Sequence, residues 1–497
     1  MQVAVSVAAN DSFAATQNQT PLYDALVKYA KSDVTSFDVP GHKRGRDDYP
    51  LMETLGEMTL KMDANSMKEL DLLSHPESVI QQAQQLAAEA FNVDHAYFLV
   101  NGTTVGILAM ILATCKPGDV IIVPRNCHKS VMNGIILSGA RPVFIQPEVD
   151  KHFGVAHGIS ITQVKAAMND YPNAKAILVT YPTYFGAMND LQTICQLAHA
   201  QNMAVLVDSA HGAHLSFCPD AVDAVAAGAD AVTISMHKTG GSLTQSSMLL
   251  LQGKRLNPAH MQKVLNMLQT TSANYLLMSS LDVARRELAL FGQERFQQLK
   301  PIVLRTIDAI EHQTSYEVLK ADYVETYFKQ HYDWTKLVIR VNGLGLTGFE
   351  VYTLLKEKYN IQAELAEGYV VMCVISHMDT AKSLQKLVHA LKDIELTYAK
   401  PEPLQMEGVV ISHINDLAMT PQQASYADGE ILLIDEAIGR ISKDSIMIYP
   451  PGIPLVIPGE VISEQVVALY HFYSRNIGNV LTETTKKNTI NVVKGDR

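Results

Sequence analysis

The chain has 497 residues, of which 47% are hydrophobic and 18% charged, so two or three domains with a large core are expected. The net charge of -11 argues against a nucleic-acid-binding protein, which needs a basic face. The five cysteines lack CxxC spacing, so we predict neither a metal site nor a disulfide framework. Because no signal-like start and no bilayer-length apolar stretch is present, we expect a cytoplasmic protein with no membrane partner.

The N-terminal half of the chain reads as a tail, a helix and then an alternation of helices and strands. Residues 1–20 are polar without a period and are predicted to be a disordered tail, and residues 21–29 have helical spacing. Later apolar runs predict strands at 97–100, 120–123, 142–145, 176–180, 203–207 and 230–234. Helical patterns lie between most of them, at 76–91, 104–115, 161–169 and 191–201. This pattern predicts an α/β fold with a mostly parallel sheet, whose ligands bind at the carboxyl ends of the strands.

The character of the sequence changes after residue 270. A long helix is predicted at 275–300, followed by strands at 337–341 and 370–375 in a smaller α+β domain. A Pro-Glu-Pro linker begins at residue 401, and residues 449–454 form a stiff proline-rich segment. We therefore predict five parts: a tail (1–20), an N-terminal arm and interface segment (21–75), a large ligand-binding domain (76–270), a small α+β domain (271–400) and a C-terminal domain (401–497).

A lysine and an aspartate follow two of the predicted strands. Lys238 comes just after the strand at 230–234, and Asp208 comes directly after the strand at 203–207. A lysine held out of water beside other cations has a lowered pKa and becomes nucleophilic. A carboxylate opposite a pyridine ring nitrogen keeps that nitrogen protonated. A Schiff-base lysine and a pyridinium-pairing acid are the minimum equipment for pyridoxal 5'-phosphate, PLP. Alone, Asp208 is equally suited to capping a helix.

A phosphate site is predicted from two loops. Gly102, Thr103 and Thr104 lie between a strand and a helix, where glycine, hydroxyl groups and helix amides together bind anions. Alone, they favour an ordinary threonine-capped helix, and the residues of a second loop reverse this preference. Ser235 and His237, which flank Met236 ahead of Lys238, can complete the phosphate cup.

Two histidines are further candidates. His128 follows the strand at 120–123 and is either a ring that stacks on the cofactor or a surface histidine. His211, three residues after Asp208, can orient that carboxylate or contact the cofactor. His214 is more consistent with a structural role.

With these residues in place, the chain resembles the prokaryotic ornithine/lysine/arginine decarboxylases, PLP enzymes with the aspartate aminotransferase fold (fold type I). It is most similar to their short form without the N-terminal wing domain, especially the bacterial biosynthetic arginine decarboxylases. The resemblance runs from residue 21 to about residue 460. It rests on the segments VPGHK (39–43), VNGTT (100–104), PRNCHKS (124–130), PTYFG (182–186), DSAHG (208–212), SMHK (235–238), LTQSS (243–247), AIGRI (437–441), YPPGIP (449–454) and PGE (458–460).

The resemblance implies PLP-dependent decarboxylation of a basic L-amino acid, with arginine giving agmatine and CO2 for polyamine biosynthesis. Lys238 would carry PLP, Asp208 would pair with the ring nitrogen, and Lys238 or His128 would protonate the α-carbon. Glu460 and Asp71 are candidates for binding the distal cation of the substrate, and each is also consistent with a solvated surface carboxylate. Two departures from the family pattern, Leu72 and Ser74 in the segment 70–76, bear on the substrate more than on the reaction class.

Three alternatives stay open at this point. Lysine or ornithine, giving cadaverine or putrescine, is the nearest alternative substrate. An aminotransferase is possible on the same architecture, because a fold does not determine a function. A catalytically silent subunit would not need Lys238, Asp208 and the phosphate-site residues. The resemblance also implies a homodimer or larger homo-oligomer, whose partner completes each site through residues 37–78.

Overall fold

The computed structural model describes residues 12–406, 414–448, 453–476 and 480–495. The chain divides into two compact units. The first comprises residues 1–113 and 207–298, and the second comprises residues 114–206 and 299–497. The boundaries of the five predicted parts remain a prediction. Among the described residues, no helix combines the length and the apolar character needed to cross a membrane.

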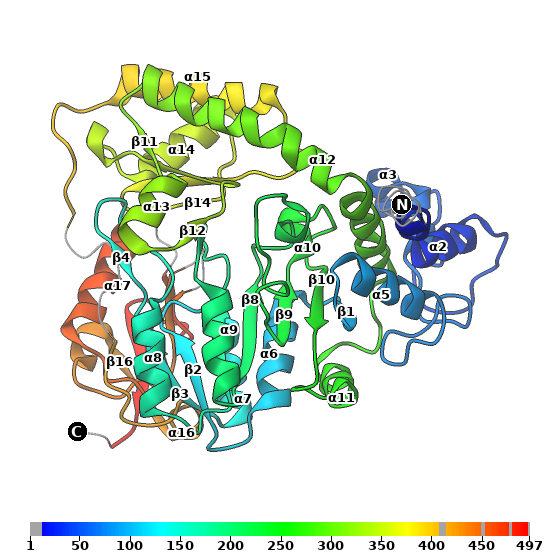
Figure 1. Cartoon of the computed structure of the whole chain (residues 1–497), viewed down its shortest axis with the longest axis horizontal. Helices are drawn as coiled ribbons and strands as arrows, with labels where there is room; N and C mark the ends of the chain where they lie inside the picture. The colour runs from blue at the N-terminus through cyan, green and yellow to red at the C-terminus, as the bar shows by residue number, and fades with distance from the viewer. Residues whose placement is uncertain (1–11, 407–413, 449–452, 477–479, 496–497) are drawn as a thin grey trace, which may run out of the picture. The chain divides into compact units, whose positions relative to one another are not determined.

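The first unit contains one end of the main sheet, in the order β1-β10-β9-β8. Strand β1 (His95–Leu99) pairs antiparallel with β10 (Ser247–Leu251), and β10 pairs antiparallel with β9 (Ala231–Ile234). All residues of β9 and β10 are buried, as expected for strands covered on both faces. Around them lie the helices α5 (Val79–Ala90), α6 (Gly102–Thr114), α10 (Met236–Thr239) and α11 (Pro258–Leu268) (Figure 1).

The second unit contains the other end of the sheet, in the order β8-β6-β2-β3. Strand β8 (Ala204–Ser209) is divided between the units after Leu206. Strand β2 (Val120–Pro124) pairs parallel with both β3 (Arg141–Ile145) and β6 (Ala176–Thr180). The helices of this part are α7 (Lys129–Ser138), α8 (Ile161–Asp170) and α9 (Leu191–Ala200), and its short strands are β4 (Val149–Asp150), β5 (Val155–Ala156) and β7 (Ala187–Met188). The predicted α/β pattern with a mostly parallel sheet is confirmed.

The N-terminal segment of the first unit is more ordered than predicted. Residues 12–17, part of the predicted tail, are helical, and the Gln17 side chain is fully buried. The backbone carbonyl of Gln17 accepts a hydrogen bond of 2.6 Å from Arg285, which is itself fully buried in α12 (Tyr275–Gln313) beside Asp282. The expectation of a disordered tail is therefore wrong for residues 12–20, and residues 1–11 lie outside the described residues.

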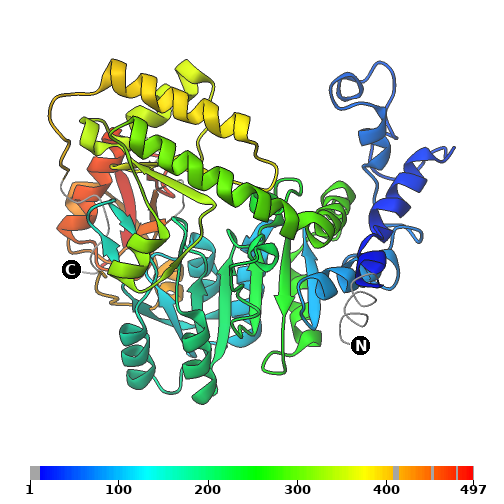
Figure 2. The same cartoon turned by 45° about the horizontal axis from the view of Figure 1, so that its top comes forward.

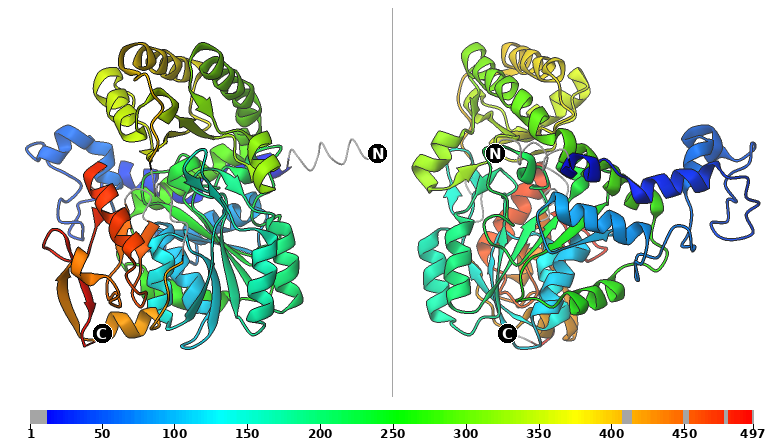
Figure 3. Two further views of the ribbon diagram at one scale, coloured as in Figure 1. Left: turned by 90° about the vertical axis from the view of Figure 1, so that its left-hand side faces the viewer. Right: turned by 45° about the vertical axis from the view of Figure 1, so that its right-hand side comes forward.

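An arm follows this segment. It comprises α2 (Pro21–Lys31), α3 (Pro50–Leu55) and α4 (Glu57–Met62), and Figures 2 and 3 show its blue ribbon standing away from the strands of the first unit. The Arg44 guanidinium donates hydrogen bonds to the carbonyls of residues 29, 30, 32 and 34 at the C-terminus of α2. Arg44 therefore fixes the segment that follows α2 against the C-terminus of that helix.

Two further sheets complete the second unit. The first has the order β11-β13-β15-β14, made by β11 (Glu317–Val318), β13 (Lys336–Arg340), β14 (Leu365–Ala366) and β15 (Val370–Val374). Its helices are α13 (Ala321–Phe328), α14 (Gly348–Tyr359) and α15 (Ala381–Tyr398), and β12 (His331–Tyr332) pairs with β7. The predicted strands at 337–341 and 370–375 match β13 and β15 to within one residue.

The C-terminal part, coloured orange to red in Figure 3, has a core of its own. Strand β16 (Gly429–Leu433) pairs with β20 (Thr489–Val493), and β17 (Ile446–Ile448) lies between β18 (Ile453–Val456) and β19 (Val480–Leu481). The helices are α16 (Pro421–Tyr426) and α17 (Glu464–Asn476). Of the predicted stiff segment, residues 449–452 lie outside the described residues.

Candidate active site

Lys238 lies on the short helix α10, which begins directly after β9. Its Nζ atom is 3.0 Å from Nε2 of His211, a buried histidine in the turn that follows β8. The structure therefore brings together two of the predicted residues from separate segments of the first unit. The expectation that Lys238 is held out of water is not met in the single chain, where this residue is exposed.

Asp208 is buried near the end of β8, three residues before His211. Its Oδ1 atom accepts a hydrogen bond of 3.1 Å from the backbone amide of Ala210. A buried carboxylate at a strand end is suited to pairing with a protonated ring nitrogen, because each group compensates the desolvation of the other.

The predicted phosphate residues come together in the same unit. Oγ1 of Thr103, in the first turn of α6, is 3.1 Å from Oγ of the buried Ser235. Gly102 has φ +72°, a conformation that glycine adopts without strain, and a Cβ placed there would meet only the Gln245 carbonyl, 4.0 Å away. Two hydroxyl groups beside a helix N-terminus make a site for a phosphate group.

His237 is tied to a neighbouring loop. Its Nδ1 atom donates to the backbone carbonyl of Ser246 over 2.9 Å. Burial lowers the pKa of His237 below its usual range, the hydrogen bond to Ser246 acts in the opposite direction, and the charge of Lys238 lowers the pKa further. A neutral imidazole beside the phosphate site is the consequence.

Sequence reasoning missed the contribution of Gln245. Its backbone carbonyl accepts a hydrogen bond of 2.9 Å from the Gly102 amide, and its side chain donates to the Val100 carbonyl over 2.6 Å. Gln245 has φ +83°, which is unusual for a residue with a side chain. The sequence signal for Gln245 is its place in the segment LTQSS (243–247), which is part of the family resemblance.

His128 belongs to the second unit, where it caps the N-terminus of α7. Its Nδ1 atom accepts a hydrogen bond of 3.2 Å from the Ser130 amide, and the Ser130 hydroxyl is 2.8 Å from the same atom. The capping contact fixes the orientation of the imidazole ring. Its stacking on a cofactor ring stays a prediction.

Glu460 has a different environment from the one predicted. Both of its oxygens accept from the Arg125 guanidinium, at 2.9 Å and 2.8 Å, and both side chains are buried, with 0% and 2% exposure. Oε2 also accepts from the Ile457 amide and from Asn415 Nδ2. A buried carboxylate with these partners holds the C-terminal part in place, and this geometry does not favour the expected contact with substrate.

Asp71 also has a structural role in this geometry. Its carboxylate accepts hydrogen bonds from the backbone amides of Leu72, Glu77, Ser78 and Ile80, where α5 begins. Burial alone would raise the pKa of Asp71, but the amide hydrogen bonds, that of Glu77 first, outweigh it and hold the pKa below the usual range. The carboxylate is occupied with the chain's own backbone, which does not favour the predicted binding of a substrate cation.

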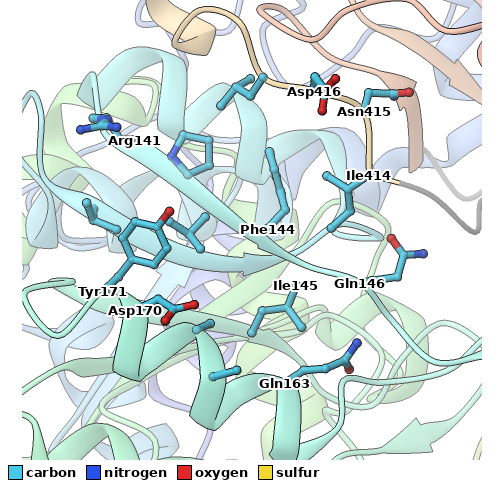
Figure 4. A pocket seen from close by; sticks show the side chains of 16 residues that line it. Arg141, Phe144, Ile145, Gln146, Gln163, Asp170, Tyr171, Ile414, Asn415 and Asp416 are labelled. Carbon is cyan, nitrogen blue, oxygen red and sulfur yellow. The ribbon is translucent and has the colours of Figure 1, made fainter.

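A cavity of about 640 Å³ lies elsewhere, in the second unit (Figure 4). It is lined by the edge strand β3, by α8 and by residues 414–417, and labelled polar side chains such as Arg141, Gln163 and Asp416 surround it. None of the predicted site residues lines it. Among the described residues, no group of three or more His, Cys, Asp or Glu side chains is arranged to hold a metal ion.

The residues of the first unit fit PLP. Gly102 leaves room for a phosphate beside the hydroxyls of Thr103 and Ser235, and Asp208 offers a buried carboxylate for a ring nitrogen. Lys238 presents its amine at the surface of the unit, where a carbonyl group can reach it. The donor set thus suits a phosphorylated aldehyde with a basic ring.

Comparison with solved structures supports the same fold. A lysine decarboxylase of Francisella novicida superposes with a TM-score of 0.83 at 20% identity, covering 96% of this chain and 82% of that one. The constitutive lysine decarboxylase of E. coli gives a TM-score of 0.80 at 18% identity, covering 96% and 82%. An alanine–glyoxylate aminotransferase of Nostoc sp. gives 0.52 at 17% identity, over 63% of this chain and 86% of that one. The predicted aspartate-aminotransferase-like fold is confirmed.

Comparison of sequences is more specific. Residues 20–383 match the major domain of the Orn/Lys/Arg decarboxylase family, and residues 405–479 match its C-terminal domain. The chain is 42% identical over 466 residues to a protein named arginine decarboxylase from Bacillus subtilis, covering 93% of this chain and 95% of the relative. A Bacillus anthracis protein of the same name is 42% identical over 457 residues, covering 90% and 92%. The prediction of a PLP-dependent decarboxylase is confirmed, and the chain belongs to the Orn/Lys/Arg decarboxylase family.

Proposed function

We propose that the substrate is L-arginine and that the products are agmatine and CO2. The observation that carries the proposal is the 42% identity, over nearly the full length of both chains, with the Bacillus subtilis protein named arginine decarboxylase. The cluster of Lys238, His211 and Asp208 in the first unit supports the decarboxylase chemistry on which the substrate proposal depends.

Five of the predicted residues have a role in this proposal. When bound, PLP supplies a protonated ring that withdraws electrons from the α-carbon as CO2 leaves. Thr103 and Ser235 would hold the phosphate, Asp208 would keep the proton on the ring nitrogen, and Lys238 would supply the amine that carries the cofactor. Lys238 or His128 would donate the proton that takes the place of CO2 on the α-carbon.

The substrate proposal is tested by a panel of amino acids. We expect CO2 release with arginine to exceed that with lysine or ornithine, and mass spectrometry to identify agmatine as the product. The Lys238→Ala variant is the matched control for background decarboxylation. Lysine or ornithine as the preferred substrate would overturn the arginine proposal and leave the reaction class intact. Amine transfer that depends on a keto acid, without CO2 release, would indicate an aminotransferase instead.

We also infer that the active form is at least a homodimer whose partner completes each site through residues 37–78. The arm carries large apolar side chains that are exposed in the single chain, including Phe37 (91%), Val39 (57%) and Leu55 (51%). Exposed apolar side chains gathered on one segment are typical of an interaction surface. Mixing a Lys238→Ala variant with an inactive variant of the arm should restore part of the activity. A fully active monomer in sedimentation would contradict the proposal.

A cytoplasmic location is consistent with the five cysteines, none of which forms a disulfide with another described cysteine. Fractionation of cells that express the protein would test this. Recovery outside the cytoplasm would overturn it.

A further inference from the structure

The contact between Lys238 and His211 joins two side chains that differ in solvent exposure and that lie in separate segments of the chain. Lys238 is exposed on α10, whereas His211 is 5% exposed and lies in a turn after β8, where the Gly212 amide donates to the Ser209 carbonyl. The distance of 3.0 Å between Nζ and Nε2 is that of a hydrogen bond. The buried imidazole therefore directs one nitrogen at the reactive amine.

A hydrogen bond between these two nitrogens requires one proton between them. A protonated lysine amine has three donors and no lone pair, so Nε2 of His211 must then accept. Moving that proton from Nζ to Nε2 produces a neutral amine and an imidazolium. Histidine is suited to this exchange because its ordinary pKa lies near neutrality.

The other titratable groups along these two segments are Asp208, His214 and His237. His237 is the alternative base by position, since it adjoins Lys238 in the chain. Its Nδ1 atom is committed to the Ser246 carbonyl, and burial keeps its pKa low. Asp208 accepts from the Ala210 amide. His211 Nε2 lies within hydrogen-bond distance of Lys238 Nζ, at 3.0 Å.

We infer that His211 is the base that takes a proton from Lys238 Nζ, so that the amine can attack the aldehyde carbon and form a C–N bond as the C=O bond breaks. His211 then returns this proton to the carbonyl oxygen, which takes a second proton from Nζ and leaves as water. The step conserves charge: a lysine ammonium and a neutral imidazole become a neutral lysine amine and an imidazolium. The inference deepens the proposed function and rests on Lys238 being the residue that carries PLP.

The test follows covalent attachment of PLP to the apoenzyme rather than turnover. Attachment is monitored by absorbance and fixed by borohydride, and the modified peptide is identified by mass spectrometry. The His211→Asn variant keeps a side chain that can accept a hydrogen bond but cannot take up a proton at neutral pH. His211→Ala removes both properties. His260→Asn is the matched control, because it makes the same substitution at an exposed histidine of the same unit.

We expect attachment to slow by on the order of 100-fold in both His211 variants, which is a typical contribution of general base catalysis. Added imidazole should restore the rate of His211→Ala with a pH dependence that follows the imidazole added. The rate should depend more steeply on pH in His211→Asn than in the unmodified protein, because without a base only an amine that is already neutral can react. His260→Asn should match the unmodified protein.

Two failures are distinguishable. If the unmodified protein attaches no PLP to Lys238, the proposed function itself is wrong. If PLP attaches normally but His211→Asn is as fast as the unmodified protein, His211 only positions the amine and the inference is overturned. A slow His211→Ala variant that imidazole does not rescue at any pH would also overturn it.

Discussion

Replacing Glu367 with glutamine should make the stability of the second unit less sensitive to alkaline pH. Glu367 lies in the turn between β14 and β15, is buried, and accepts a hydrogen bond of 3.3 Å from the Tyr473 hydroxyl on α17. Burial raises the pKa of Glu367 from 4.5 to about 8, and the hydrogen bond from Tyr473 only partly opposes this. The folded protein therefore keeps this carboxyl protonated at neutral pH.

The sign of the effect follows from proton binding. An unfolded chain releases the Glu367 proton near pH 4.5, whereas the folded chain holds it until about pH 8. The stability contributed by the protonated carboxyl is complete below about pH 4.5 and is lost as pH rises through about 8. Since each pKa unit corresponds to about 1.4 kcal/mol, the loss amounts to about 5 kcal/mol across this interval. Glu367→Gln has no proton to lose and should escape it.

The assay is guanidinium unfolding of both proteins at several pH values between about 5 and 9. The single tryptophan, Trp334, lies in the second unit, so its fluorescence reports on the unit that contains Glu367. Glu364→Gln is the control, because Glu364 is an exposed neighbour. The difference in unfolding free energy between Glu367→Gln and the unmodified protein should rise with pH by several kcal/mol. A difference that stays constant across this range would refute the reasoning.

Three further substitutions test the site and its supports. Lys238→Ala should abolish borohydride-fixed PLP and lower turnover by several orders of magnitude, since it removes a covalent catalyst; near-normal turnover would contradict the assignment. Asp208→Asn should still bind PLP, as measured by absorbance, but its turnover should be much slower because an amide cannot hold the proton on the ring nitrogen. An unchanged kcat would show that Asp208 only caps a helix. Glu460→Ala leaves Arg125 buried without its carboxylate and should cost about 3–5 kcal/mol of unfolding free energy. A loss below about 1 kcal/mol, the value of a surface pair, would show that the pair is not buried in solution.

Strands of the main sheet could be predicted because a strand buried on both faces is a short apolar run, and helical segments separate most of these runs in the sequence. Strands β2, β6 and β9 each match such a run to within one residue. Strand β10 is equally apolar but was not predicted, because no helix separates it from the residues that follow Lys238. Its antiparallel pairing with β1 brings together positions about 150 residues apart, which no local pattern reveals.

The site was predictable where it depends on strand ends and was not where it depends on distant partners. Position shortly after a predicted strand is the signal that identifies Thr103, Ser235 and Lys238. The ion pair of Glu460 could not be predicted because its partner Arg125 lies 335 residues earlier in the chain, where no local pattern connects the two. The contacts of Asp71 could not be predicted because its hydrogen-bond donors are backbone amides, which every sequence contains.

The pairing of β1 with β10 has a consequence for how the protein is made. A ribosome releases β1 long before β10, and until Leu251 has emerged the edge of β1 that faces β10 has no strand to pair with. An unpaired apolar strand is a template for association with other chains. Nascent chains that stall between residues 100 and 246 are therefore the aggregation-prone species. Expression at low temperature, or with a chaperone that binds such strands, should therefore raise the yield of folded protein.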